Sequence, residues 1–417
     1  MPMNNFSAIP SMRKSTRTLA VAATVLAALG AGALLLGNGA VSVLAGCVAG
    51  LTALAVGWLA RAGATTQERQ RRIETSKPDL FLALNQGRSE AAVAGGTVPA
   101  WSVWRRWVAR YFFGHLLMVG DSVQVKSLVA IRATLDAEGC LGGLPFMDEM
   151  VSFCGQSLRV YRVVDKVYDY GRSRLMRRLD DCVLLVGLRC DGGAHAGCEA
   201  ACYLIWNSAW LDAPGARAES LSGSPPPREP GTDSDRLSCQ YTQLTQSSRA
   251  AASSVNLHGV LGPLAVGNVT ASAFSLALMT RVFNAFQAWR GGAAYPAKPT
   301  PSDDKTIRGE PLARGDWVRV KTPVEIARAM DKNSKNRGLW FDRDMLKHCG
   351  QTYRVRGRVE KIIDVGSGRI IPMKTPCIVL EEVHYSGEFQ GFGEQHDFLY
   401  WREAWLEPMA PSEAPGR

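Results

Sequence analysis

The stretch GDSVQVK at residues 120–126 recurs as GDWVRVK at residues 315–321. The match extends without a gap from 120–211 onto 315–406, a shift of 195 residues, with 31 of 92 aligned positions identical. Other matching pairs are CGQSLRV at 154–160 with CGQTYRV at 349–355, and WNSAWL at 206–211 with WREAWL at 401–406. One module is therefore present twice, at 119–213 and at 311–410, and both copies are expected to fold alike.

The module reads as β-rich. Val123 and Val125 alternate after the Gly120-Asp121 turn, which predicts a strand, and the spacing over 128–135 predicts a short helix. The further extended runs are 158–164, 182–188 and 203–206, repeated as 353–363, 376–383 and 398–401. Short strands separated by turn residues predict a small barrel. The opening GDxVxVK and the closing Trp-Leu resemble the SH3-like barrels of bacterial proteins.

Length, charge and cysteine content give the first expectations about domains and binding partners. The 417 residues predict two or three domains, and the net charge of +10 favours an anionic neighbour, either a membrane face or nucleic acid. Six of the ten cysteines lie between Cys140 and Cys202. Their interpretation depends on the compartment, because a reducing one favours metal, catalytic or core cysteines over disulfides.

The N-terminus predicts a membrane anchor. After a basic tail at 1–18, the uncharged runs 19–36 and 40–60 are separated by a Gly-Asn-Gly turn, so 19–61 is expected to be a two-helix transmembrane hairpin. Arginines and lysines flank both outer ends and are absent from the turn, which predicts a bacterial inner-membrane protein with both long ends cytoplasmic. A cleaved signal peptide is the alternative for the first run.

A juxtamembrane connector is expected at 62–118. Its segment 99–113 interleaves aromatic residues with arginines on a helical spacing. Such a helix could lie at the membrane interface or pack on the following domain. Binding of single-stranded nucleic acid is a weaker alternative. Between the modules, 214–250 is a Pro/Ser linker and 251–310 a middle helical segment, and 411–417 is a tail.

The middle segment is expected to contain one helix over 271–289, ended by Gly291-Gly292. The stretch 250–280 has no charged residue and is long enough for a third membrane span. Its glycines, proline and polar side chains argue against that interpretation.

A cysteine cluster carries the clearest chemical signal. Cys190, His195, Cys198 and Cys202 lie within one glycine-rich stretch, and Cys239 follows the linker. Thiolates and imidazole are ligands for zinc or iron–sulfur clusters, and tetrahedral zinc takes four of them. The predicted metal ligands are therefore Cys190, Cys198 and Cys202, with either Cys239 or His195 as the fourth.

The second module serves as an internal control. It places Tyr385, Gln390, Gly393 and Asp397 at the positions of Cys190, His195, Cys198 and Cys202. By contrast, the pairs Cys154/Cys349 and Cys182/Cys377 persist and are interpreted as core thiols. The set that is lost together indicates a function specific to the first module: a metal or cluster site, with plain core cysteines or a redox or catalytic thiol as alternatives.

The pattern GLPFMDEM…CG…RCDGGAHAGCEAAC…AWL at 143–211, with GLWFD and YWREAWL in the second half, resembles a family of uncharacterised bacterial proteins. Members are often met near polysaccharide or natural-product biosynthesis genes. The resemblance covers roughly residues 119–410 and carries the cysteine motif onto Cys190, Cys198, Cys202 and Cys239, with His195 beside them. It implies no reaction, and the hairpin is an addition in this chain.

The sequence therefore predicts a membrane-anchored β-rich (α+β) protein with two SH3-like modules and a zinc-like site in the first. The expected function is that of a scaffold or interaction protein that recruits a cytosolic protein partner to the membrane. An iron–sulfur or thiol redox component of a biosynthetic pathway is the alternative. Nucleic-acid binding ranks last, because much of the positive charge borders the expected membrane anchor. No Walker loop, HExxH or GxSxG motif points to an enzyme class.

Overall fold

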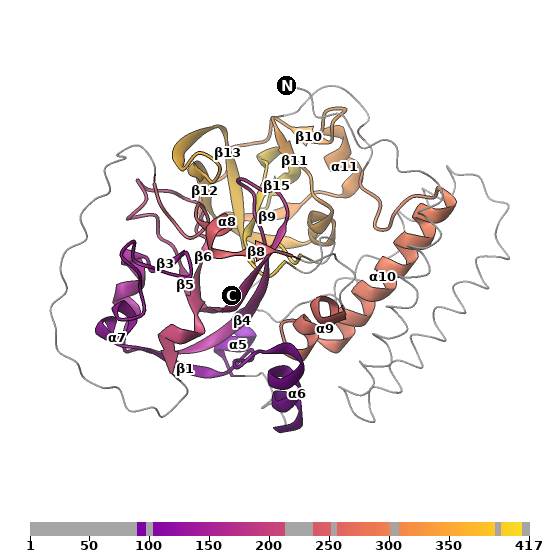
Figure 1. Cartoon of the computed structure of the whole chain (residues 1–417). Helices are drawn as coiled ribbons and strands as arrows, with labels where there is room; N and C mark the ends of the chain where they lie inside the picture. Colours follow the sequence, from indigo (N-terminus) through magenta and orange to yellow (C-terminus); the bar gives the residue numbers. More distant parts are fainter. Residues whose placement is uncertain are drawn as a thin grey trace. The chain divides into compact units, whose positions relative to one another are not determined.

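The structure is a computed structural model, and it describes residues 90–96, 103–212, 237–251, 257–299, 301, 308–387 and 393–410 (Figure 1). The chain forms two compact units. The described part of one unit holds the helices α9 (Leu257–Ala265) and α10 (Ala271–Arg290). The other unit holds both repeats, together with the short stretch Val266–Asn268.

Helix α10 confirms the helix expected over 271–289. Thr270 caps its first turn, because the hydroxyl accepts a hydrogen bond from the backbone NH of Ala273 at 3.2 Å. Gly291 ends the helix in the left-handed conformation, at a φ of 76°, which glycine adopts without the steric cost that a Cβ would add.

The two repeats contain the same elements in the same order. The first repeat consists of β1 (Ser122–Val125), α7 (Leu128–Arg132), β2 (Cys140–Leu141), β3 (Leu144–Pro145), η1 (Asp148–Phe153), β4 (Ser157–Tyr168), β5 (Met176–Arg189), β6 (Tyr203–Asn207), η2 (Ser208–Trp210) and β7 (Leu211–Asp212). The second consists of β9 (Trp317–Val320), α11 (Pro323–Arg328), β10 (Lys335–Asn336), β11 (Leu339–Trp340), η3 (Arg343–His348), β12 (Thr352–Asp364), β13 (Arg369–His384), β14 (Phe398–Trp401), η5 (Glu403–Trp405) and β15 (Leu406–Pro408). Outside the repeats lie α5 (Glu90–Ala94), α6 (Val103–Phe113), α8 (Leu244–Ser247) and β8 (Arg249–Ala250).

Sheet topology is duplicated as well. The strand orders β6-β5-β4-β1-β7 and β14-β13-β12-β9-β15 correspond one to one, and every pairing between these strands is antiparallel. Each repeat is built on one long hairpin, β4–β5 or β12–β13, and the register shifts fall at equivalent places in both hairpins. The strands expected from the sequence are therefore confirmed. The two repeats also have β-bulges or irregularities at equivalent positions.

Each repeat has its own apolar core, centred on a pair of tryptophans. Trp206 and Trp210 are fully buried in the first repeat, as Trp401 and Trp405 are in the second. Phe146 packs edge-on against Trp210, with ring centroids 5.3 Å apart, and the second repeat reproduces this contact. Edge-to-face rings at this distance attract each other, so this contact stabilises the core of each repeat.

The repeats also bind each other, beginning with a contact from the second repeat to the first. The buried Glu394 carboxylate accepts hydrogen bonds from two consecutive backbone NH groups of β4, those of Asp165 at 2.6 Å and Lys166 at 2.9 Å. The Glu394 NH in turn donates to the Lys166 carbonyl at 2.9 Å. A loop of the second repeat is thereby fixed to the long hairpin of the first.

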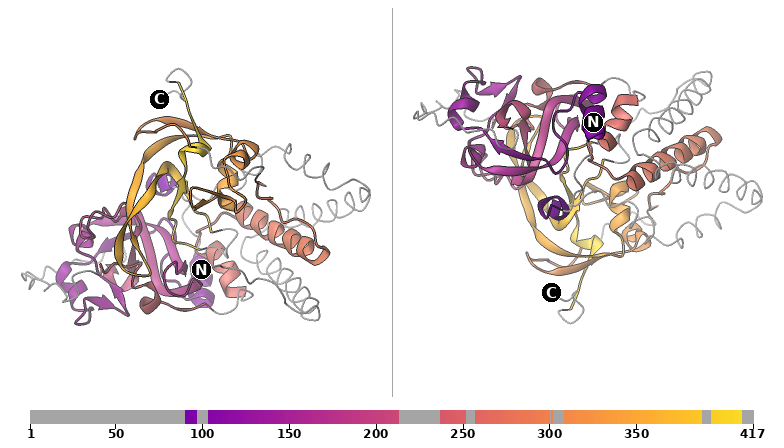
Figure 2. Two further views of the ribbon diagram at one scale, coloured as in Figure 1. Left: turned by 90° about the horizontal axis from the view of Figure 1, so that it is seen from above. Right: turned by 90° about the horizontal axis from the view of Figure 1, so that it is seen from below.

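The first repeat makes the equivalent contact to the second. Glu199, in the first repeat, accepts hydrogen bonds from the backbone NH groups of Glu360 at 2.5 Å and Lys361 at 3.3 Å in β12. Its own NH donates to the Lys361 carbonyl at 3.0 Å. Both views of Figure 2 show the two long hairpins crossing side by side. The pairing of the repeats is thus reciprocal, as in an isologous dimer formed within one chain.

The expected fold class is corrected by this architecture. The described chain is a mixed α/β structure with several sheets, and not a membrane-anchored β-rich chain of SH3-like barrels. Short helices interrupt each repeat, and the 20-residue α10 lies between the repeats in the chain. The sequence interpretation gave too much weight to the short strands and their turns.

The predicted membrane anchor and inner-membrane location are corrected too. No helix among the described residues is long and apolar enough to cross a membrane. The runs 19–36 and 40–60 lie outside the described residues, so the transmembrane hairpin has no support from the structure. An uncharged run of suitable length permits a membrane span, but it does not by itself establish one.

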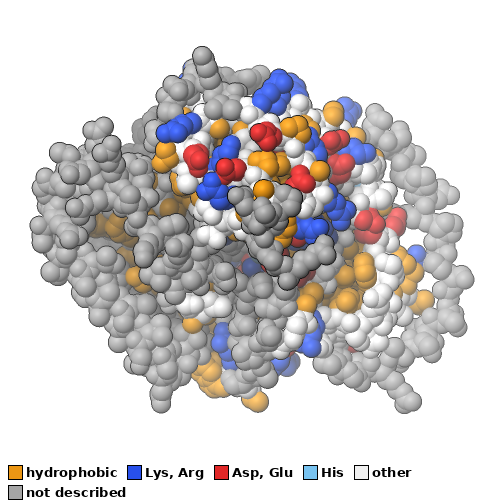
Figure 3. All heavy atoms as spheres, turned by 180° about the vertical axis from the view of Figure 1, so that it is seen from behind, with side chains coloured by type: hydrophobic (Ala, Val, Ile, Leu, Met, Phe, Trp, Pro, Cys, Tyr) orange, Lys and Arg blue, Asp and Glu red, His pale blue; other side chains and the backbone are white. Residues whose placement is uncertain are grey.

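Charge is mixed on the face of the molecule seen in Figure 3. Lys and Arg side chains are interspersed there with Asp and Glu side chains among the coloured residues. A field of one sign, which would favour a polyanion, is not seen on that part of the described surface.

Candidate metal centre

One cavity of about 400 Å³ brings the predicted ligands together. Its wall includes all five of them: Cys190, His195, Cys198, Cys202 and Cys239. The wall also includes Glu149 from the first repeat and residues of the second repeat, among them Ile363 and Asp397. The cysteine cluster is therefore one site in space, at the place where the repeats meet.

The loop between β5 and β6 folds back on itself to form this wall. The backbone NH groups of His195 and Gly197 both donate to the Gly192 carbonyl at 2.9 Å. Gly192 has a φ of 77°, and a Cβ built there would lie 2.1 Å from the carbonyl oxygen of Cys198. Only glycine fits this close turn. The Cys190 NH donates to the Cys202 carbonyl at 2.8 Å and closes the loop.

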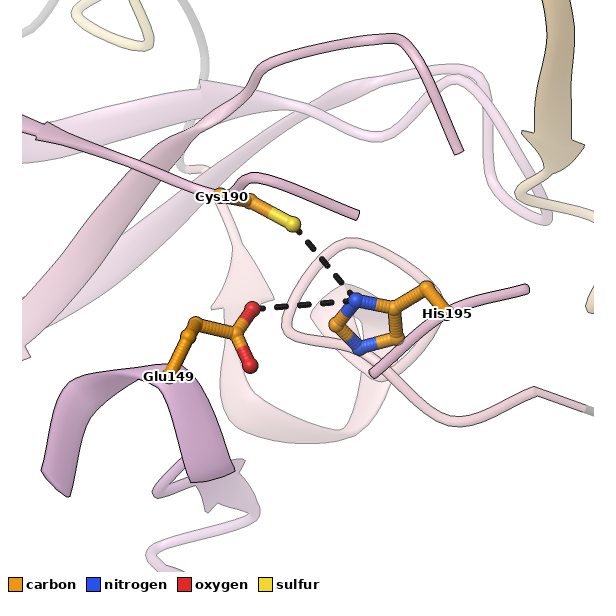
Figure 4. Close-up of side chains that lie close together, drawn as sticks. All are labelled: Glu149, Cys190 and His195. Atoms are coloured by element: carbon orange, nitrogen blue, oxygen red, sulfur yellow. Dashed lines mark hydrogen bonds and ion pairs between the residues drawn. The ribbon is translucent and has the colours of Figure 1, made fainter. Parts of the chain in front are cut away.

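Three side chains converge inside the loop (Figure 4). Nδ1 of His195 lies 3.5 Å from Sγ of Cys190 and 3.6 Å from a carboxylate oxygen of Glu149. One ligand atom from each of the three residues lies within 4.8 Å of the other two. In the described part of the chain, this is the one group of histidine, cysteine or acidic residues that meets this criterion.

These separations suit a shared ion. Zinc bound tetrahedrally at about 2.0–2.3 Å from each ligand atom places the ligand atoms roughly 3.4–3.6 Å apart. A cysteine–histidine–acid relay needs the nucleophile and the acid on opposite ring nitrogens. Here Cys190 and Glu149 both approach the same nitrogen of His195, so the geometry fits coordination better than a relay.

Three polar atoms of the cluster have no hydrogen-bond partner in the described part of the chain. Neither carboxylate oxygen of Glu149 has one among the described residues, and neither does Nε2 of His195, although all three atoms are buried. Such groups are costly to bury unless something satisfies them. The second repeat has Asp344 at the position of Glu149, where it accepts hydrogen bonds at 2.6 Å from both the NH and the hydroxyl of Ser386. In the first repeat, no described residue donates such hydrogen bonds to Glu149.

Electrostatics in the cavity disfavour uncompensated thiolates. Burial raises the pKa of Cys190 to about 12 and that of Cys202 well above its ordinary value. Burial also raises the pKa of Cys239. A bound divalent cation supplies the opposite charge and stabilises coordinated thiolates.

The remaining predicted ligands line the cavity without joining the cluster. Sγ of Cys198 accepts a hydrogen bond from the Ile363 NH of the second repeat at 3.4 Å. Cys239 is placed by its neighbour Gln240, which is buried and hydrogen-bonds both the NH and the carbonyl of Ile205. The structure thus brings Cys190 and His195 into contact and leaves Cys198, Cys202 and Cys239 around them.

Sequence reasoning missed Glu149. It lies in the GLPFMDEM segment, far from the cysteine loop in the sequence, and η1 carries it to the loop. A usable signal was the acid retained at this position in the second repeat, Asp344. His396 is half-buried, and its ring lies against Tyr161, with Nδ1 2.9 Å from the phenol oxygen.

Comparison with models of known protein families finds no match for this chain, and neither does comparison with curated protein sequences.

Proposed function

We propose that this chain is a metal-binding interaction protein whose first repeat holds one zinc ion through Cys190, His195 and Glu149. The observation that carries the proposal is the convergence of three buried ligand atoms within 4.8 Å, with the Glu149 carboxylate and the second His195 nitrogen lacking hydrogen-bond partners among the described residues. Soft thiolate and imidazole ligands with one carboxylate form a typical zinc set.

The role proposed for the ion is structural. The loop that supplies Cys190 and His195 also supplies Glu199, which binds two NH groups of β12 in the second repeat. Fixing the base of this loop therefore stabilises one half of the contact between the repeats. In the other half, the Ser386–Asp344 hydrogen bonds do the equivalent work without an ion.

A second candidate is an iron–sulfur or thiol redox component. It is favoured by the four thiols that line one cavity, because iron–sulfur clusters are usually held by four cysteines. It is the weaker candidate, since three of the four thiols lie outside the converging group.

The test is elemental analysis and visible absorbance of the full chain purified without oxygen. We expect about one zinc per chain and no chromophore. Glu149→Gln and Cys190→Ser should each lose most of the zinc. Asp148→Asn is the matched control, because Asp148 is the exposed neighbour of Glu149 and should leave the zinc content unchanged.

Two results would overturn the zinc proposal. A brown protein containing iron and sulfide would establish the redox candidate instead. A folded, colourless protein without metal, unchanged in thermal stability by added zinc, would leave the cluster as a set of buried thiols and hydrogen-bonding groups.

A further inference from the structure

The stretch Val266–Asn268 lies along one edge of β4 in the first repeat. The Val119 NH donates to the Val266 carbonyl at 3.1 Å. The Asn268 side chain accepts from the Val163 NH at 2.9 Å and donates to the Val163 carbonyl at 2.7 Å. The same amide donates at 3.0 Å to the Glu394 carboxylate oxygen that does not bind the NH groups of β4. The side chain of Asn268 thus provides hydrogen bonds to the backbone of β4 and to the Glu394 carboxylate that joins the repeats.

The equivalent place in the second repeat is a cavity of about 410 Å³. Val119, Val163 and Glu394 correspond by the repeat to Arg314, Arg358 and Glu199, and all three of these line the cavity. Glu199 uses one oxygen for the NH groups of β12, and its other oxygen has no hydrogen bond from the described residues. Among the described residues, no side chain in this half of the pair does what Asn268 does in the other half.

The cavity differs from its occupied counterpart in charge. Val119, Tyr161 and Val163 are replaced by arginines, namely Arg314, Arg356 and Arg358. The Arg358 guanidinium is paired with Glu403, while Arg314 and Arg356 are exposed and form no ion pair with the described residues. The guanidinium of Arg356 lies 4.8 Å from the centre of the Phe398 ring. Two guanidiniums without an ion pair to the described residues, one of them beside an aromatic ring, favour a negatively charged ligand.

We infer that this cavity binds a short acidic segment of a partner protein, which presents an asparagine or glutamine side chain as Asn268 does in the first repeat. The amide would bond the backbone of Arg358 and the free oxygen of Glu199. Acidic side chains beside it would pair with Arg314 and Arg356. The inference rests on the repeat and on the charge of the cavity, and it does not depend on the proposed metal.

The test is fluorescence anisotropy of a labelled peptide titrated with the full chain. The peptide copies residues 264–270 and carries two added aspartates at each end. We expect saturable binding that weakens about tenfold or more in the Arg314→Ala/Arg356→Ala variant, since hydrogen bonds to charged groups are worth more than neutral ones. Replacing the asparagine of the peptide with alanine should weaken binding to the unchanged protein by about tenfold.

The matched control is Arg369→Ala/Lys374→Ala, which removes the same charge from exposed positions outside the cavity. It should leave the affinity unchanged. Equal losses in both double variants would reveal general charge attraction and overturn the inference, as would the absence of saturable binding. Displacement of the peptide by an equal concentration of inorganic phosphate, with no effect of the peptide's asparagine, would show a small-anion site instead.

Discussion

Glu199 and Glu394 occupy equivalent positions in the two repeats, and each carboxylate accepts hydrogen bonds from two consecutive backbone NH groups of the other repeat. The two glutamates differ in burial, because Glu394 is 2% exposed whereas Glu199 is half-buried. Within the described part of the chain, the second carboxylate oxygen of Glu394 accepts a hydrogen bond from Asn268, whereas that of Glu199 accepts none. Duplication has therefore produced two halves of one interface with unequal environments.

Removing the two carboxylates should have unequal costs. Glu394→Ala leaves two backbone NH groups and one of the two NH donors of the Asn268 amide buried without an acceptor, so we expect a loss of about 3 kcal/mol in the free energy of unfolding. Glu199→Ala should cost about 1 kcal/mol, because its site is more open to water. Chemical denaturation of both variants at neutral pH checks this. Equal costs would contradict the asymmetry.

The buried carboxyl also predicts a pH dependence. Burial raises the pKa of Glu394 from 4.5 to about 7, against the opposing influence of Lys166 and the backbone NH groups. Between these values the folded chain retains a proton that the unfolded chain has released, so this group lowers stability as the pH rises. The stability of the wild type relative to Glu394→Gln should fall by about 3 kcal/mol from about pH 4 to pH 8. Urea titrations at stepped pH measure this difference, and a constant difference would refute the prediction.

Zinc should stabilise the chain by mass action. Free zinc at 100 times its dissociation constant adds about 2.7 kcal/mol to the free energy of unfolding, if it binds only the folded state. We expect thermal unfolding of the chelator-treated full chain to shift upward when zinc is restored. The shift should vanish in Cys190→Ser and persist in Cys140→Ser, whose thiol lies outside the cavity. A shift that persists in Cys190→Ser would place the ion elsewhere.

The cysteine loop should tolerate no side chain at Gly192. A Cβ there would approach the Cys198 carbonyl oxygen to 2.1 Å, at a positive φ, so Gly192→Ala should cost about 2 kcal/mol or more and reduce zinc binding. The neighbouring Gly193→Ala is the control, because its Cβ would meet only the Asp191 carboxylate, at 3.2 Å. Denaturation and zinc content of both variants measure the difference. Similar behaviour of the two variants would disprove the close turn.

Much of the local structure was predictable. Val123 and Val125, alternating after a Gly-Asp turn, predicted β1, and Gly291-Gly292 predicted the end of helix α10. These signals succeed because turns, caps and alternation depend on neighbours in the sequence. The fold class failed for the opposite reason. Whether an uncharged, alanine-rich run enters a membrane, or short strands close into a barrel, depends on the surfaces available to cover them.

The candidate site was predictable in part. Cys190 and His195 were recognisable by residue type and by their joint absence from the second repeat. Glu149 was not, because no pattern links it to a loop that follows two strands later. The place of Cys198 beside the Ile363 NH of the other repeat could not be anticipated either. Contacts of this kind appear only when segments remote in sequence are packed together.

The sequence by itself determined that the chain contains one module twice, which elements each copy forms, and which chemical groups only one copy carries. The tertiary structure alone decided that the copies bind each other reciprocally and that Glu149 completes the cluster. It also decided that Asn268 fills one of two equivalent places, whereas the described residues at the other form a cavity lined by arginines. The physical reason is the separation in sequence of the residues that interact. Backbone conformation follows from adjacent residues, whereas burial of a charge or an amide is fixed by what the completed fold places against it.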